Sequence, residues 1–153
     1  MPPEGKHSKA VYMGSDGICS GDVGQKLLID CSTIDTASFL ESQDHITKNF
    51  PYASLYDASV SGSVIGAERG TIAFFLGCAD DNTKDIHELR ELFSLMGDKL
   101  IPCGDPSLGI AAKLSNKHLS GIITIVYSGA MDMGMKSRID PRVLSQIYAA
   151  GNA

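Results

Sequence analysis

The chain has 153 residues, a length that suits one domain by the usual range of about 100–200 residues per domain. Hydrophobic residues make up 43% of the sequence and charged residues 20%, a composition that excludes a disordered chain or a membrane-spanning one. The apolar stretch at residues 121–126 is too short to cross a bilayer. With a net charge of −5 and no long run of Lys or Arg, nucleic acid is not an expected partner.

The four cysteines and four histidines do not occur at metal-ligand spacings. The sequence has no CxxC or HxxxH pair, so we predict no metal site. The cysteines are expected to be reduced, mostly buried thiols of an intracellular protein. The first ten residues lack the apolar core of a signal peptide and the Arg-rich character of a transit peptide.

The N-terminal third begins with a predicted loop and continues with a strand and a helix. Residues 1–25 are rich in Gly, Ser and Pro and are predicted to form the loop, with a short strand end at Ala10–Met13. The apolar run Lys26–Asp30 has the form of a buried parallel strand. A helix is predicted over Thr36–Asn49, and Pro51 ends it.

Strands and helices continue to alternate up to about residue 105, which indicates an α/β fold. Asp80-Asp81-Asn82 offers capping side chains for the helix of this region. Pro102 makes the last strand an edge strand. The predicted elements are the strands Ser54–Ala58, Thr71–Leu76 and Lys99–Cys103, the loop Ser59–Gly66 and the helix Thr83–Met96.

From Ser107 onward the sequence is predicted to be all helical. Residues 107–136 read as one long helix. Asp140 and Pro141 have the types expected at a helix start, and a last helix follows at Arg142–Ala150. We therefore divide the chain into an α/β domain at residues 1–105 and a helical domain at residues 106–153.

A polar stripe runs along the long helix, which is otherwise apolar nearly all round. An apolar helix of that kind is typically buried on most faces. The polar residues recur at steps of three and four and therefore share one face. This face is either solvated, or it lines a cleft in which a desolvated lysine acts as acid and base, with its pKa lowered by the second lysine. The stripe consists of Lys113, Asn116, Lys117, Ser120 and Thr124.

Small residues follow the second strand, at Ser59-Val60-Ser61-Gly62-Ser63. Such a segment either connects a strand to a turn or lets backbone amides and hydroxyl groups approach an anion. It is not a P-loop, because no Gly-Lys-Ser/Thr follows. Its glycines do not have the GxGxxG spacing of a dinucleotide-binding turn, and no other part of the sequence has it.

Five segments carry motifs in a consistent order: residues 28–35 (LIDCSTID), 57–63 (DASVSGS), 66–77, 107–116 (SLGIAAKLSN) and 131–151. Together they resemble the β-hydroxyacid dehydrogenase family, in particular its 3-hydroxyisobutyrate dehydrogenase branch. The corresponding family motifs are DxST, DAPVSGG, GA…GTL…GG, GxGxxxKxxNN and EAMxLG…GLDP. The resemblance extends from about Ala10 to Asn152.

The resemblance implies roles for individual residues. In this family the motif lysine assists proton transfer at the substrate hydroxyl while hydride passes to NAD(P), and Lys113 matches it. The VSG segment holds the substrate carboxylate, which makes Ser61, Gly62 and Ser63 the candidates. The threonine of the DxST element lies beside the cofactor, so Thr33 is the candidate there. Of the two asparagine positions that contact substrate and orient the amine, Asn116 occupies the first and Lys117 the second.

Three positions depart from the family pattern. Lys117 supplies only donors and a charge where Asn supplies a donor and an acceptor, so we expect weaker orientation of Lys113. Ser59 replaces the loop proline, and Ser107 replaces the first glycine of the lysine motif. The last two changes affect backbone stiffness more than chemistry.

The resemblance further implies NAD or NADP as cofactor and a small β-hydroxyacid such as 3-hydroxyisobutyrate as substrate, oxidised to its semialdehyde. Tartronate semialdehyde and 6-phosphogluconate are alternative substrates, although no basic cluster for a phosphate is visible. A homo-oligomer formed through the helical domain is expected. The expected compartment is mitochondrial for a eukaryotic protein and cytoplasmic otherwise.

The segment that bears GxGxxG in the family has no counterpart here. The chain is therefore expected to form the second half of a Rossmann-like cofactor domain, then a long hinge helix and the start of an all-α domain. Because it cannot anchor the pyrophosphate, we expect the chain alone to be inactive. The alternative is a non-catalytic module that pairs through the hinge helix.

Overall fold

The computed structural model describes residues 1–79 and 82–151. The chain forms two compact units, which we call the N-terminal unit (Met1–Leu114) and the C-terminal unit (Ser115–Ala153). The predicted division of the chain into residues 1–105 and 106–153 stays a prediction. In the described part of the chain, no helix combines the length and the apolar character needed to cross a membrane.

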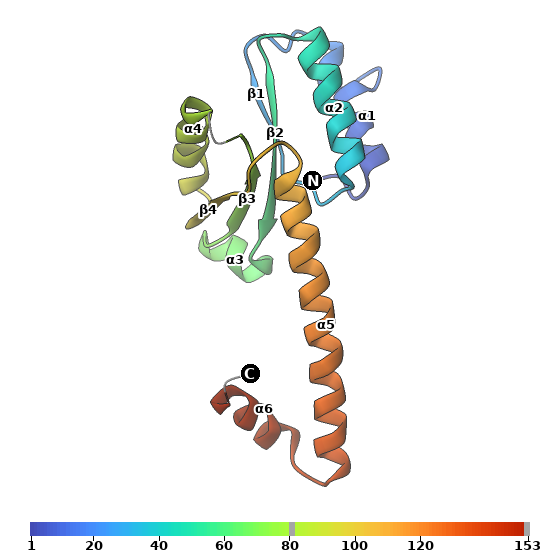
Figure 1. Ribbon diagram of the computed structural model, residues 1–153, viewed down its shortest axis with the longest axis vertical. Coiled ribbons are helices and arrows are strands. Elements are labelled where there is room, and N and C mark those ends of the chain that lie inside the picture. The colour runs from blue at the N-terminus through green and yellow to red at the C-terminus, as the bar shows by residue number, and fades with distance from the viewer. Residues whose placement is uncertain (80–81, 152–153) are drawn as a thin grey trace. The chain divides into compact units, whose positions relative to one another are not determined.

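A four-stranded sheet forms the centre of the N-terminal unit, in the order β1-β2-β3-β4 (Figure 1). Strand β2 pairs in parallel with β1 and antiparallel with β3, and β3 pairs in parallel with β4. The antiparallel step follows from the short connection at residues 62–72, because a parallel crossover needs a dozen or more residues. The strands are β1 (Leu27–Asp30), β2 (Ser54–Ser61), β3 (Ala73–Gly77) and β4 (Lys99–Pro102).

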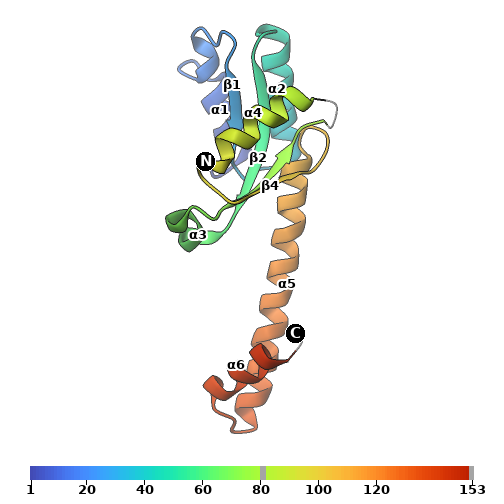
Figure 2. The same ribbon diagram turned by 90° about the vertical axis from the view of Figure 1, so that its left-hand side faces the viewer.

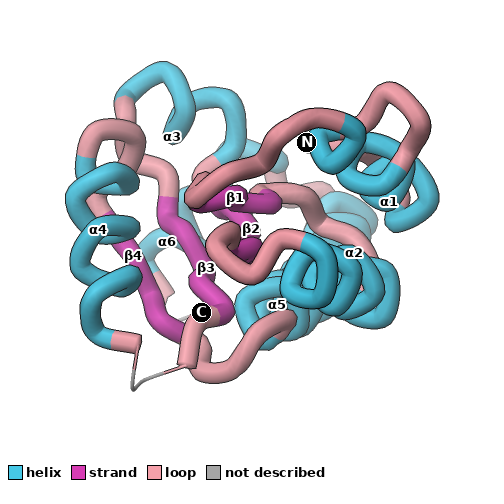
Figure 3. Tube along the Cα trace, turned by 90° about the horizontal axis from the view of Figure 1, so that it is seen from above, coloured by secondary structure: helices cyan, strands magenta, loops and turns pink. Residues whose placement is uncertain are grey.

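Helices cover both faces of this sheet, which confirms the predicted α/β class. Figure 3 shows α1 (Gly5–Met13) and α2 (Thr36–Asn49) on one side and α4 (Thr83–Ser94) on the other. Side chains alternate along β2, as the pleat requires. Leu55 joins the core cluster beneath α1 and α2, whereas Tyr56 joins the cluster beneath α4.

The prediction was wrong for the first 25 residues, where a helix replaces the loop and the strand end at Ala10–Met13. Helix α1 buries Gly5, Ser8 and Tyr12, at steps of three and four. A Cβ on Gly5 would overlap Ser38 in the first turn of α2, so the two helices approach closely. Two of the three buried residues are small or polar, so this face shows no apolar periodicity in the sequence. A short 3₁₀ turn (Ile18–Ser20) follows α1.

The loop predicted at Ser59–Gly66 was also wrong in part. Strand β2 continues to Ser61, and α3 (Ser63–Arg69) begins two residues later. The helix ends at Gly70, whose φ of 64° lies in the left-handed region that glycine tolerates. Local propensity gives a weak signal here because the helix is only two turns long.

The other predicted strands and helices are confirmed, with ends that differ from the prediction by at most three residues. Pro102 lies at the end of β4, and β4 is an edge strand as predicted. The Asn82 side chain caps α4 by accepting a hydrogen bond from the Asp85 amide at 3.4 Å. The other two residues of the predicted cap, Asp80 and Asp81, lie outside the described residues.

Helix α5 (Leu108–Lys136) is continuous as predicted, and α6 (Pro141–Ala150) follows it. The Asp140 carboxylate caps α6 by accepting from the Arg142 amide at 2.7 Å, and Pro141 occupies the first turn. The expectation that the long helix is buried on most faces was wrong. Ile125 is 74% exposed and Val126 65% exposed, because α6, the other helix of the C-terminal unit, covers only part of this stretch.

Candidate active site

The carboxyl ends of β1 and β2 lie side by side and bring two of the predicted site residues to one edge of the sheet. The parallel register pairs Asp30 with Asp57, and the Ser59 hydroxyl donates to the Ser32 carbonyl at 3.0 Å. This hydrogen bond continues the alignment of the two chains past the end of β1. Thr33 and Ser61 are both half-buried there.

The turn after β2 consists of Gly62 and Ser63. Gly62 has a φ of 151°, and Ser63, the first residue of α3, has a φ of 60°. Both residues are exposed. A Cβ on Gly62 would come within 3.3 Å of the Ile72 Cα, so the turn lies close against the chain that enters β3. The small residues therefore leave the backbone of this turn open to solvent at the sheet edge.

A buried carboxylate joins β2 to the start of α5. Asp57 is fully buried, and its two oxygens accept hydrogen bonds from the Ser107 amide at 2.8 Å and the Ile110 amide at 2.7 Å. The first amides of a helix have no partner within the helix, so the carboxylate satisfies groups that would otherwise be unpaired. Burial raises the pKa of Asp57, and these amide hydrogen bonds oppose that shift.

Lys113 lies one turn after this attachment. Ile110 is completely buried in the core beneath α1 and α2, and Lys113 follows three residues later on the same face of α5. Lys113 is half-buried. Figures 1 and 2 show that the first turns of α5 leave the sheet in the direction in which β2 runs. Lys113 thus follows the attached first turn of α5, and Ser61 ends β2, the strand that carries Asp57.

The other two predicted substrate contacts lie in the C-terminal unit. Asn116 and Lys117 continue α5 and are exposed. The hydroxyl groups of the polar stripe bond to the helix itself: Ser120 donates to the Asn116 carbonyl at 2.8 Å and Thr124 to the Ser120 carbonyl at 2.9 Å. These hydroxyls need no external partner. The N-terminal unit thus holds Thr33, Ser61, Gly62, Ser63 and Lys113.

A second buried carboxylate, for which sequence analysis proposed no role, lies at the end of β1. Asp30 accepts from the Ser8 hydroxyl at 2.6 Å and from the Ser32 amide at 2.8 Å. Among the described residues, the Ser32 hydroxyl is the one buried side-chain oxygen without a hydrogen-bond partner. The two hydrogen bonds that Asp57 accepts from the start of α5, which we call the Asp57 clamp, were missed in the same way. An aspartate inside an apolar strand is the signal that could have revealed both, because a buried carboxylate needs partners.

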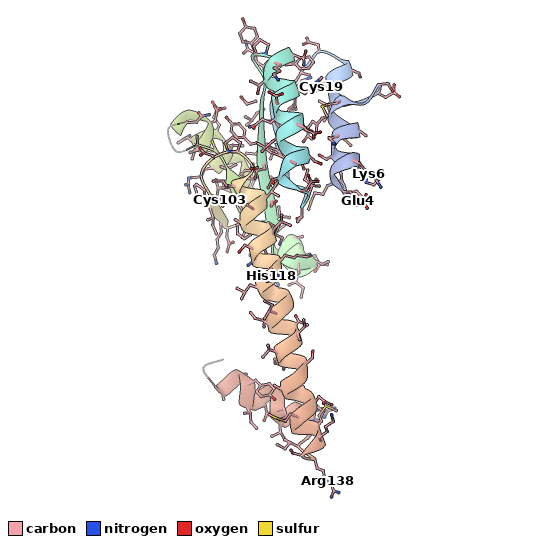
Figure 4. All side chains as sticks on the ribbon, turned by 45° about the vertical axis from the view of Figure 1, so that its right-hand side comes forward. Glu4, Lys6, Cys19, Cys103, His118 and Arg138 are labelled. Carbon is pink, nitrogen blue, oxygen red and sulfur yellow. The ribbon has the colours of Figure 1, made fainter. Side chains whose placement is uncertain are left out.

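The cysteines do not gather at this edge. Cys19, in the 3₁₀ turn, packs against the core beneath α1 and α2, whereas Cys103 follows β4; both are labelled in Figure 4. Burial raises the pKa of the Cys31 thiol to about 11, so this half-buried thiol is not an activated nucleophile. Within residues 1–79 and 82–151, no group of three or more Cys, His, Asp or Glu could hold a metal ion.

A dinucleotide cofactor needs a helix N-terminus with open amides for its pyrophosphate. In the described chain, the three helices longer than two turns that follow strands are all capped by the chain itself. Asp35 accepts from the Ser38 amide at 2.8 Å in α2, Asn82 caps α4, and Asp57 caps α5. Each of these helix starts therefore has fewer open amides to offer a pyrophosphate.

The fold defines the class as an α/β domain, with helices on both faces of a mostly parallel sheet. The profile of the NAD-binding domain of 6-phosphogluconate dehydrogenase matches residues 1–104. The chain belongs to this family of NAD-binding domains, and within it the sequence is similar to 3-hydroxyisobutyrate dehydrogenases.

Two curated relatives and one solved structure illustrate that similarity. A probable mitochondrial 3-hydroxyisobutyrate dehydrogenase of Dictyostelium discoideum is 35% identical over the whole chain and 46% of its own length. The 3-hydroxyisobutyrate dehydrogenase of Pseudomonas aeruginosa is 36% identical over 96% of the chain and 48% of its own length. The Mycobacterium tuberculosis 3-hydroxyisobutyrate dehydrogenase, solved with L-serine, has a TM-score of 0.81 at 26% identity, over 99% of this chain and 50% of that one. The chain thus spans about half the length of the relatives it matches.

Proposed function

We propose that the chain serves the NAD(P)-dependent oxidation of a small β-hydroxyacid such as 3-hydroxyisobutyrate to its semialdehyde. The observation that carries the proposal is the Asp57 clamp. It attaches α5, which bears Lys113, to β2, which ends in the Ser61-Gly62-Ser63 turn. A hydroxyacid needs both an acid/base for its hydroxyl and a seat for its carboxylate, and the clamp joins the two elements that carry these groups.

In the proposed mechanism, the turn at residues 61–63 binds the substrate carboxylate through hydroxyl and amide donors. The neutral amine of Lys113 takes the proton of the substrate hydroxyl, and Asn116 contacts the substrate. Thr33 would lie beside the cofactor, whose nicotinamide would supply the acceptor for the hydride that leaves the hydroxyl-bearing carbon.

Lys117 is the position at which this chain departs from the family's lysine motif, which has asparagine there. An asparagine could both donate to and accept from the neighbouring amine and substrate, whereas the lysine can only donate. In a complete enzyme that contains this chain, Lys117→Asn is therefore expected to raise kcat. Steady-state kinetics with 3-hydroxyisobutyrate measure the effect, and an unchanged kcat would count against the assigned role of position 117.

The binding half of the proposal is tested by nuclear magnetic resonance on the chain itself. Titration with 3-hydroxyisobutyrate is expected to shift the amide signals of residues 61–63 and 113 in a saturable manner. Isobutyrate, which lacks the hydroxyl, and the methyl ester, which lacks the carboxylate, are the matched controls and should bind more weakly. The proposal fails if the shifts fall elsewhere, or if the methyl ester produces the same shifts. Tartronate semialdehyde and 6-phosphogluconate in the same titration rank the alternative substrates.

We expect the chain alone to bind NAD(P)H weakly and to lack turnover. The reason is that α2, α4 and α5 are capped by the chain's own side chains. A fluorescence titration with NADH and NADPH measures the binding. Saturable binding at micromolar cofactor would contradict this expectation and would require a seat for the pyrophosphate elsewhere in the chain.

A second candidate function, self-association through the C-terminal unit, is favoured by the exposed surface of its helices. A groove of about 700 Å³ lies between α5 and α6 and is lined almost entirely by apolar side chains. No charged side chain occurs in residues 119–131, so a second copy would meet no like charge there. The two helices of this unit bury little more than Leu144, so a second copy that covers the groove would stabilise them. The groove residues are Ile122, Ile123, Val126, Tyr127, Ala130, Ser145, Tyr148 and Ala149.

Light scattering after size exclusion tests this pairing. The parent chain is expected to be a dimer, and Val126→Glu in the groove should yield a monomer. Met133→Glu is the control, because Met133 is 69% exposed on the same helix but does not line the groove. A monomeric parent, or equal effects of the two substitutions, would rule out pairing through this groove.

A further inference from the structure

We infer that Asp57 is a positioning residue for Lys113: one carboxylate on β2 sets where α5 starts and thereby where the amine lies relative to the turn at residues 61–63. Asp57 does not touch the substrate, because it is fully buried between β2, β3 and α5. The inference rests on the proposed function and adds a residue that acts through Lys113.

The contacts of Asp57 are specific to a carboxylate of this length. One oxygen accepts from the Ser107 amide at 2.8 Å and the other from the Ile110 amide at 2.7 Å. An asparagine would present an NH₂ group to one of these amide donors, so one hydrogen bond would become a repulsive contact. A glutamate would need space that the surrounding backbone does not leave.

Two glycines leave just enough room for the Asp57 carboxylate. A Cβ on Gly77 would overlap the Asp57 Oδ1 atom, and a Cβ on Gly109 would lie 2.8 Å from the Asp57 Oδ2 atom. The same Cβ on Gly109 would lie 2.9 Å from the Gly77 amide nitrogen. Strand β3 and the first turn of α5 therefore approach closely enough to enclose the carboxylate, and neither element can shift without losing a contact to it.

The two ends of the proposed site depend on Asp57 to different degrees. The strand end at Ser61 is held by its pairing with Ala73 in β3 and by the bond from Ser59 to Ser32. Lys113 lies only three residues after Ile110, about 4.5 Å along the helix axis, so it moves with the first turn of α5. Loss of the clamp is therefore expected to displace the amine and leave the carboxylate seat in place.

The test compares Asp57→Asn with Asp35→Asn in the full chain. Asp35 is the matched control because its carboxylate also caps a helix, accepting from the Ser38 amide at 2.8 Å in α2 and not from any amide of α5. The lysines are reductively methylated with a ¹³C label, and Lys113→Arg assigns the Lys113 signal. We expect Asp57→Asn to move or broaden that signal. Binding of 3-hydroxyisobutyrate should weaken at least about tenfold, because the displaced amine would lose its hydrogen bond to the substrate. Asp35→Asn should leave both unchanged.

The outcomes separate this inference from the proposed function. If the parent binds the hydroxyacid and Asp57→Asn leaves the Lys113 signal and the affinity unchanged, the positioning role is overturned while the function stands. If the Lys113 signal moves but the parent does not bind the hydroxyacid, the proposed function fails and the link between Asp57 and Lys113 remains.

A second measurement needs no variant and covers the case in which Asp57→Asn does not fold. In the parent chain, the amides of Ser107 and Ile110 should exchange with deuterium at least about tenfold more slowly than unbonded loop amides, because each donates to a buried carboxylate. Exchange as fast as in the loops would show that the clamp does not form in solution, and it would overturn the inference.

Discussion

Gly109 offers the sharpest test of how closely α5 is attached to the sheet. Replacing it with alanine adds one methyl group, which would overlap the Phe75 carbonyl oxygen of β3 and come within 2.8 Å of the Asp57 carboxylate. The overlapped atoms include backbone, so they cannot rotate away as the end of a flexible side chain could. The first turn of α5 must therefore move, and Gly109→Ala should destabilise the N-terminal unit.

Two opposing contributions set the magnitude. Alanine is favoured over glycine within a helix by about 1 kcal/mol. Displacing the first turn weakens two hydrogen bonds to a buried carboxylate, each worth about 1.5–3 kcal/mol. The net loss is expected to be about 3 kcal/mol, which for a unit of this size lowers the melting temperature by roughly 10 °C.

Gly121→Ala is the matched control, because it is the same substitution in the same helix at a position where a Cβ meets nothing within 4 Å. It should leave the stability unchanged or raise it by about 1 kcal/mol. Urea unfolding followed by circular dichroism measures both variants. A midpoint for Gly109→Ala at or above that of the parent would refute the close attachment of α5 to β3.

Three further predictions use the backbone and the titrating groups. Ser107 has a φ of 73°, so Ser107→Gly should relieve left-handed strain and raise the free energy of unfolding by about 0.5–1 kcal/mol, measured by urea unfolding; a lower midpoint would contradict this. Cys31, with its pKa raised to about 11, should react with iodoacetamide at pH 8 roughly a hundredfold more slowly in the folded chain than in the unfolded chain; equal rates would mean that the thiol is not buried. Because the pKa of Asp57 is raised above its ordinary value of 3.8, its contribution to stability is greatest below that pH and is lost as the pH rises through the folded value. The stability of the parent relative to Asp57→Asn should therefore fall on going upward from pH 3.8, and a rise over that interval would reverse the sign of the argument.

Elements whose buried face leaves an apolar pattern in the sequence were predicted correctly. Helix α2 was placed at its observed bounds because a strand precedes it, apolar residues recur along it and Pro51 follows it. Helix α1 was missed because its buried face consists of Gly5, Ser8 and Tyr12, which pack through small size and a hydrogen bond to Asp30. Hydrophobic periodicity cannot reveal a helix that packs in this way.

Exposure of α5 was mispredicted for a related reason. An apolar helix sequence indicates that something covers it, but the sequence does not say whether the cover lies among the residues at hand. Ile110 is completely buried by α1, α2 and β2, whereas Ile125, about four turns further along the helix, is 74% exposed. Both positions are isoleucines in an apolar helix sequence, and only the side chains packed around them differ.

The candidate site could be predicted only where a residue type suggests chemistry. Lys113, Ser61 and Thr33 were selected by motif, and their roles remain proposals. Asp57 was quoted within a motif but given no role, because its importance depends on a contact with residues 50 and more positions later in the chain. Gly77 and Gly109, which make room for that carboxylate, carry no signal without the fold.

The Asp57 clamp also sets the smallest piece of this chain that can be cut out and studied alone. A version ending at residue 104, where the family match stops, would remove both amides that donate to the buried carboxylate and would delete Ile110 from the core. Leaving a buried charge without its partner costs about 3–5 kcal/mol, a large share of the stability of a small domain. An excised sheet domain therefore has to retain the first two turns of the helix that follows it.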